Sequence, residues 1–225
     1  MANTTFKGNV RSEDGLTVFN TAADTGTETN KATIDSSGNT SLSGTLAVTG
    51  ATTISGVTDL AGNAGPTAGT GITTGTGTIY ASSVTHSGCM WHTSILIDLT
   101  GLASSGSGDI IGKAGTASSN IGTTTVALNG TILSGKLTCM ETPAGSDPDI
   151  DLWYADESTG AEDAAITSLT NQTQMLNSGD LAAGSVLGIP VPPAASKFMY
   201  LVTGAATNAN YTAGKILIEF FGYDA

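Results

Sequence analysis

The sequence predicts an all-β protein, in which a C-terminal jelly-roll-like β-sandwich follows an N-terminal β-hairpin arm and a short glycine-repeat stalk. Three observations support this prediction. The chain of 225 residues contains 30 glycines and only 12% charged residues, a composition that favours short strands and turns over helices. Glycine recurs every six residues in one N-terminal stretch. After that stretch, about ten short runs of β-compatible residues alternate with turn residues.

The first 33 residues form the predicted attachment arm. Two short extended runs flank Asp14-Gly15, a pair that favours a tight hairpin turn. The arm has too few apolar side chains to form a core of its own, so we expect it to become ordered against a partner surface. The residues that we expect to make this contact are Phe6, Val10, Arg11, Leu16, Val18 and Phe19.

Residues 34–64 carry the six-residue repeat. Its glycines are Gly38, Gly44, Gly50, Gly56 and Gly62, and the aliphatic residues two places before the last four are Leu42, Val48, Ile54 and Leu60. A six-residue period is typical of strand-and-turn repeats, in which glycine occupies the corners. So short a repeat cannot bury its own aliphatic side chains, and copies wound about one axis would bury them. The pattern therefore predicts a homotrimeric stalk, with a flexible Gly/Thr/Ser linker as the alternative interpretation.

Residues 65–78 are glycine- and threonine-rich and are predicted as a linker or a loop, and residues 79–225 are predicted as the sandwich head domain. Within the head, Thr123–Leu128 reads as a strand and Ala161–Leu169 as one or two helical turns. The closing run KILIEFFGY places Ile216, Ile218 and Phe220 on one face. Its other face is apolar too, which is expected of a central strand or of an oligomer contact.

The charge pattern argues against nucleic acid and membranes as partners. The net charge is −12, and the seven basic residues stand singly, whereas a phosphate-binding surface needs clustered lysine and arginine. The N-terminus lacks the apolar segment of a signal peptide, and no run is long enough to span a bilayer. We therefore expect synthesis in the cytosol, with Cys89 and Cys139 as buried thiols rather than a disulfide.

No motif predicts catalysis or a cofactor. The chain has two histidines and lacks a G-x-S-x-G elbow, a phosphate loop and a dinucleotide fingerprint, so we expect a protein that is not an enzyme. Zinc could be bound by His86, Cys89, His92 and Cys139. On a regular strand, however, Cys89 and His92 point to opposite faces, which argues against zinc.

The densest acidic stretch contains Asp147, Asp149 and Asp151. Oxygen-rich loops are the sites that calcium prefers, but the helix-loop-helix calcium pattern fails here because its glycine and final glutamate are missing. Two interpretations follow from these residues. One is a solvated acidic edge, and the other is a divalent cation held by the three aspartates.

Several segments resemble structural proteins of tailed bacteriophages. The stretches GNVRSEDGLTVFN and IDSSGNTSLSGTLAVTG are similar to attachment and stalk segments that precede trimeric β heads. The segment GDIIG, the run TILSGKLTCMETPAGSDPDIDLWYADESTGAEDAAITSL and the closing GKILIEFFGY look like a domain of virion proteins from marine and freshwater phages. The resemblance covers most of the chain and implies a homotrimeric virion component that acts through its surfaces.

The resemblance implies two classes of function. The first is a capsid decoration (cement) protein or short head fibre, which is assembled in the host cytoplasm and binds the major capsid protein through the arm. The second is a tail fibre or receptor-binding protein that presents the sandwich to a host ligand. About five hexads span only a few tens of Å at the extended rise, which favours a head held close to a shell.

We predict that Val48→Asp abolishes trimer formation and leaves the head folded, because it would place three unpaired carboxylates on one axis. Light scattering at micromolar concentration measures the mass, and circular dichroism measures the folding of the head. Thr52→Ser is the matched control and should leave the trimer intact. A monomeric wild-type chain, or a Val48→Asp variant with an unfolded head, would contradict this interpretation of the repeat.

Overall fold

The computed structural model describes residues 16–21, 28–34, 40–42 and 63–224. The chain divides into two compact units, Met1–Asp59 and Leu60–Ala225. In the first unit, the described residues form an antiparallel three-stranded sheet. Its strands, in sheet order, are β1 (Leu16–Thr21), β2 (Glu28–Ile34) and β3 (Thr40–Leu42).

The described hairpin of the first unit is the one formed by β1 and β2, in which Leu16 lies opposite Ile34. The hairpin turn predicted at Asp14-Gly15 lies outside the described residues. β3 pairs with the end of β2, so that Leu42 lies opposite Ala32. The predicted boundary between arm and stalk, after residue 33, therefore falls inside β2, and the beginning of the predicted stalk pairs with the predicted arm.

The second unit is the head, and nearly all its regular structure is β. Its strands are β4 (Asn63–Ala64), β5 (Ile79–Ser87), β6 (Met90–Asp98), β7 (Ala103–Ser104), β8 (Asn120–Thr123), β9 (Thr131–Ala144), β10 (Ile150–Ala155), β11 (Thr173–Leu176), β12 (Val186–Gly188), β13 (Phe198–Thr203), β14 (Ala209–Asn210) and β15 (Ala213–Tyr223). Its helical turns are α1 (Thr70–Thr73), α2 (Val126–Asn129) and the 3-10 turn η1 (Ile166–Ser168). No helix among the described residues is long and apolar enough to cross a membrane.

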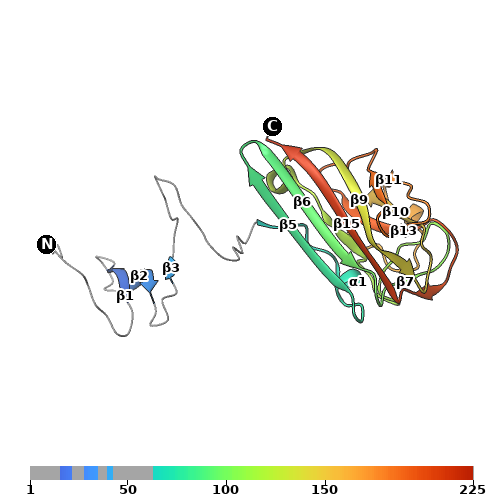
Figure 1. The fold of residues 1–225 in the computed structure, drawn as a ribbon, viewed down its shortest axis with the longest axis horizontal. Helices are drawn as coiled ribbons and strands as arrows, with labels where there is room; N and C mark the ends of the chain where they lie inside the picture. The colour runs from blue at the N-terminus through green and yellow to red at the C-terminus, as the bar shows by residue number, and fades with distance from the viewer. Residues whose placement is uncertain (1–15, 22–27, 35–39, 43–62, 225) are drawn as a thin grey trace, which may run out of the picture. The chain divides into compact units, whose positions relative to one another are not determined.

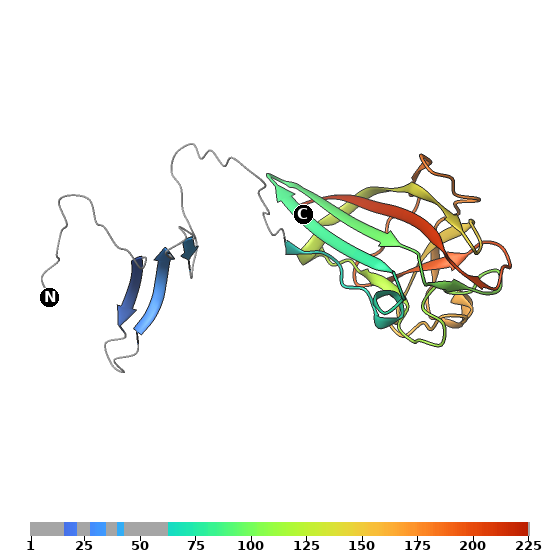
Figure 2. The same ribbon diagram turned by 60° about the horizontal axis from the view of Figure 1, so that its bottom comes forward.

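The head strands form two main sheets, shown as two layers in Figures 1 and 2. One sheet has the order β12-β9-β15-β6-β5-β4, and the other has the order β11-β10-β13-β8. Strands β6, β8, β9 and β10 pair, in that order, with β15, β13, β12 and β11. An antiparallel ribbon folded over in this way is a jelly roll. The predicted all-β sandwich is therefore confirmed.

The main core lies between the two sheets and is built by alternate residues of each strand. On β15, Ile216, Ile218 and Phe220 are at most 1% exposed, as the sequence predicted for the closing strand. β15 lies between β9 and β6, so its backbone is hydrogen-bonded on both sides. The closing strand is thus the central strand of its sheet, one of the two positions that its sequence pattern allowed.

The four-stranded sheet is also covered on its outer face. A second apolar cluster forms there, and its buried members are Ile110, Ala155, Ile166, Tyr200 and Val202. The Tyr200 hydroxyl donates to the carbonyl of Glu157 and accepts a 3.2 Å hydrogen bond from the backbone N–H of Gly160. The segment that follows β10 is tied to this sheet by these bonds, and both faces of the sheet are buried.

Residues 65–78 belong to the head as a loop that contains α1, and not as a linker. Ile72 on α1 is fully buried in the main core. Gly71 has no room for a side chain, because a Cβ atom there would lie 2.1 Å from Oγ of Ser119. Glycine in this segment therefore permits close packing of the backbone, whereas the sequence interpretation took the glycines only as a sign of a linker or loop.

Two other local predictions are wrong. The strand predicted at Thr123–Leu128 is not formed, because β8 ends at Thr123 and α2 follows it. Thr125 caps the N-terminus of α2, since its Oγ1 accepts a 3.2 Å hydrogen bond from Leu128 N. Cys89, expected to be buried, is exposed because it lies in the turn between β5 and β6. Cys139 is buried as predicted, and both thiols are free.

We predict that Ile218→Ala lowers the free energy of unfolding by about 2–5 kcal/mol, because it leaves a cavity in the core between the sheets. Val186, on the short edge strand β12, is 60% exposed and provides the control. Val186→Ala should change the stability by less than about 0.5 kcal/mol. Urea unfolding followed by circular dichroism measures both, and equal effects would place Ile218 outside the core.

Candidate functional site

The outer face of the six-stranded sheet is open among the described residues (Figure 1). Its centre is a row of side chains in register across five strands. This row is Ala81, Leu96, Leu217, Thr138 and Val186. Ala81 and Val186 are exposed, and Leu96 and Leu217 are half-buried. Four of the five residues are apolar, which is unusual for the solvent-facing side of an antiparallel sheet.

A charged row lies on one side of this aliphatic row. Lys215 Nζ lies 3.3 Å from Asp98 Oδ2 and 2.5 Å from Glu141 Oε2. Hydrogen bonds to these carboxylates, the one to Glu141 first, raise the pKa of Lys215. Burial works to raise the pKa of Asp98, but hydrogen bonds from Thr100 and Lys215 outweigh it and lower that pKa. In this row one lysine thus compensates one of two carboxylate charges.

A second charged row lies on the other side. Glu219 accepts from Lys136 Nζ at 2.9 Å and pairs with His92 Nε2 at 3.0 Å. Burial works to raise the pKa of Glu219, but the bonds from Lys136 and His92 outweigh it and lower that pKa. The His92 ring stacks on Phe221, with ring centroids 5.0 Å apart. We call the aliphatic row and its two charged rows the open face.

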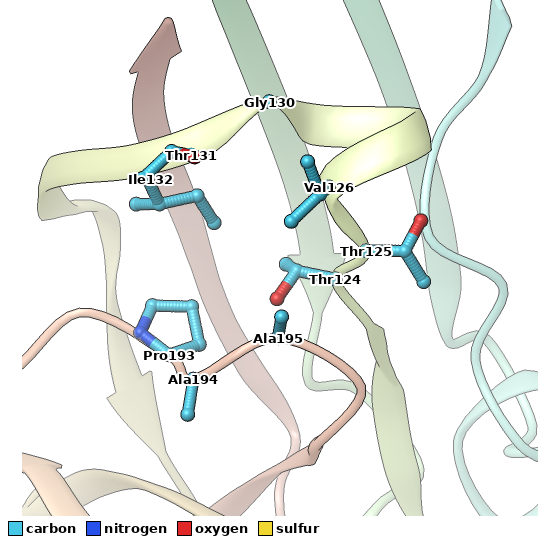
Figure 3. Close-up of a pocket in the computed structure, with 9 residues that line it drawn as sticks. All are labelled: Thr124, Thr125, Val126, Gly130, Thr131, Ile132, Pro193, Ala194 and Ala195. Atoms are coloured by element: carbon cyan, nitrogen blue, oxygen red, sulfur yellow. The ribbon is translucent and has the colours of Figure 1, made fainter. Parts of the chain in front are cut away.

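A small cavity lies between α2, the start of β9 and the proline-containing segment that precedes β13 (Figure 3). Its volume is about 230 Å³, below the range of roughly 300–1,000 Å³ usual for small-molecule pockets. Val126, Ile132 and Pro193 give it an apolar lining. Thr124 is 1% exposed, and its hydroxyl has no hydrogen-bond partner within the described residues. In size and chemistry the cavity suits one apolar side chain better than a charged ligand.

The acidic stretch is largely buried, and its carboxylates serve the fold. Asp147 is 2% exposed and accepts from the backbone N–H groups of Asp149 at 3.1 Å and Ala205 at 2.8 Å. Asp151 is also buried and accepts from Gln174 Nε2 at 2.7 Å and Ser178 N at 2.9 Å. The interpretation as a solvated edge is therefore wrong for these two residues, because segments distant in sequence cover them.

The three aspartates do not converge as metal ligands would. No group of three or more histidine, cysteine, aspartate or glutamate side chains in the described part of the chain is placed to hold a metal ion. This holds both for the predicted cation site at Asp147, Asp149 and Asp151 and for the zinc set at the two histidines and two cysteines. Burial, with the charges of the neighbouring aspartates, raises the pKa of Asp149, and burial raises the pKa of Asp151.

The end of the sandwich near the β5–β6 turn holds a polar cluster. The carboxylate of Asp224 accepts from Trp91 Nε1 at 2.5 Å and pairs with His86 Nε2 at 3.0 Å. These bonds, that of Trp91 first, lower the pKa of Asp224. The His86 ring stacks on Trp91 with centroids 4.0 Å apart, and Asp224 N donates to the carbonyl of Cys89. The cluster fastens the C-terminal end of β15 to the β5–β6 turn.

The residues predicted from the repeat and the arm belong mainly to undescribed segments. Outside the described residues lie Phe6, Val10, Arg11, Val48, Ile54 and Leu60. The described residues include Leu16, Val18 and Phe19 on β1, and Leu42 on β3. The open face was not predicted as a site. Its signal was the apolar second face of the closing run, to which Leu217 belongs.

No protein family, curated protein or solved structure was found to match the chain. The functional argument therefore rests on the sequence and on the geometry of the described residues.

We predict that Asp149→Asn stabilises the protein at neutral pH. The pKa of Asp149 is raised in the folded chain, so the folded state binds its proton more tightly than the unfolded state. Stability is therefore lost as the pH rises from the unfolded value, about 3.9, through the folded one. The melting temperature of Asp149→Asn should exceed that of the wild type at pH 7, and the difference should shrink near pH 4.

The control is the same substitution, Asp to Asn, at the exposed residue Asp163. Asp163→Asn should leave the melting temperature nearly unchanged at both pH values. A lower melting temperature for Asp149→Asn at pH 7 would mean that its carboxylate stabilises the fold.

Proposed function

We propose that the protein is a non-enzymatic phage virion protein, a homotrimeric capsid decoration protein that binds the major capsid shell through residues 1–33 and stabilises it. The observation that carries the proposal is the order of parts along the chain. A glycine-hexad repeat, which needs copies of itself to bury its aliphatics, leads into a jelly-roll head at β4. A repeat of this kind would gather several heads about one axis close to the surface that the arm binds.

Stabilisation of the shell follows from mass action. A ligand that binds the assembled shell and not its free subunits shifts the equilibrium toward the shell. Three arms on one trimer would bind neighbouring capsid subunits with an effective concentration that no single arm reaches. The net charge of −12 keeps the free protein soluble before it binds.

The second candidate function is that of a tail fibre or receptor-binding protein, and the cavity beside α2 favours it. The hollow has an apolar lining and contains the buried hydroxyl of Thr124, which has no hydrogen-bond partner among the described residues, so it is suited to accept a group from another molecule. The two functions differ in location. Antibody labelling of intact particles would place a decoration protein over the whole capsid and a receptor-binding protein at the tail.

We predict that deletion of residues 2–33 leaves a soluble, folded head that no longer binds capsids lacking the protein. The physical reason is that the arm carries the apolar residues that require a partner, whereas the head buries its own core. Co-sedimentation of the truncated chain with such capsids measures binding, with the full chain as the positive control. Because β2 crosses the boundary of the arm, a second deletion, of residues 2–15, tests the arm while sparing the described strands.

Saturation of the shell by both truncated chains would show that attachment runs through the head. Loss of binding by the longer deletion alone would place the attachment residues in the β1–β2 hairpin.

A further inference from the structure

We propose that the open face is the surface on which the head of a second copy of this chain docks. The heads of one trimer would then pack against one another in addition to being joined by the repeat. This inference rests on the homotrimer of the proposed function and assigns to the head a contact that the repeat alone does not imply.

The first support is the difference between the two sheets. The four-stranded sheet is buried on both faces, by the main core and by the second apolar cluster. Among the described residues the six-stranded sheet is buried on one face only, yet its outer face presents an aliphatic row that crosses five strands. Leu96 and Leu217 lie at the middle of that row. A row of this kind gains free energy when a second apolar surface covers it.

The second support is the distribution of charge. Residues 63–225 contain thirteen acidic residues and four lysines. Three of those acids and two of the lysines, Lys136 and Lys215, lie on the open face, where each lysine is paired with a carboxylate. The rest of the head holds ten acids against two lysines. Exposed carboxylates elsewhere on the head repel a second copy, whereas this repulsion is reduced on the open face by its two lysines.

The third support is the state of the sheet edges, which disfavours pairing of strands between copies. β12 forms one edge, is three residues long and is followed closely by Pro190, Pro192 and Pro193. Proline and short edge strands prevent the addition of a further strand. On the other edge β4 pairs with Ser83 and Val84. Pairing of strands between copies is therefore disfavoured at the β12 edge, and the open face is the apolar surface that this sheet offers to another head.

The position of β4 connects the open face with the repeat. β4 is the first described strand of the head, and it is hydrogen-bonded into the six-stranded sheet. The repeat therefore leads directly to an edge strand of the sheet that carries the open face. Copies gathered by the repeat would each present this sheet at the point where the head begins.

The size of the open face explains why it would need the repeat. Strand spacing and rise give three rows on five strands a planar area of roughly 400–500 Å². A stable interface buries about 800 Å² on each partner. The open face alone would therefore bind weakly, and the high effective concentration supplied by the repeat would make the contact form.

The test measures protection of a thiol on the open face in the full-length chain. Cys89 is exposed and is replaced by serine, whereas the buried Cys139 is kept. Leu217→Cys then places a thiol at the centre of the aliphatic row. We expect it to react with a maleimide at least about tenfold more slowly in the assembled protein than in the same protein carrying Val48→Asp. Comparison of these two chains removes the effect of the partial burial of residue 217 within one head.

Ala206→Cys, in an exposed loop away from the sheet, is the matched control and should react equally fast in both chains. If Leu217→Cys does not fold, Ala81→Cys takes its place, since Ala81 is exposed and lies in the same row. Light scattering on each variant records its mass. A trimer whose thiol at residue 217 or 81 reacts as fast as in the Val48→Asp chain overturns this inference and leaves the proposed function standing. A monomeric wild-type chain overturns the homotrimer, and this inference with it.

Discussion

The central position of β15 is the constraint on which the rest of the head depends. Its backbone is bonded to β9 on one side and β6 on the other, so the strand cannot move without breaking both ladders. One face supplies Ile216, Ile218 and Phe220 to the core. The other supplies Lys215, Leu217 and Glu219 to the outer surface, one residue for each row of the open face. Side-chain alternation along this one strand thus fixes both the core and the candidate contact surface.

Local sequence pattern predicted the features that depend on alternation and failed for those that depend on distant segments. The strands β6 and β15 and the inward face of the closing strand follow from a period of two. The burial of Asp147 could not be predicted, because the N–H of Ala205, 58 residues away, is one of the groups that hold it. The glycines near Ile72 indicate a linker or loop in the sequence, and only the approach of Ser119 shows that they permit close packing.

The open face was hidden from sequence analysis for a related reason. An aliphatic residue such as Leu96 or Leu217 reads as core in any strand, and alternation alone does not say which apolar face is covered. That distinction requires the strand order, since the register of five strands brings the two leucines into one row with Val186. The two salt-bridged rows also require the sheet, because Asp98, Lys215 and Glu141 come from three strands.

Weak self-association of the head would be an advantage for a protein that must assemble in order. A large apolar face would drive free heads to associate before the repeat brought copies together, and a face without charge would favour aggregation. The open face avoids both early association and aggregation, because its aliphatic row is only one residue deep along each strand and lies between two rows of paired charges. Removal of one partner, for example Lys215, would leave Asp98 and Glu141 uncompensated and add repulsion between copies. If the repeat joins copies as proposed, the charged rows would restrict docking to those copies.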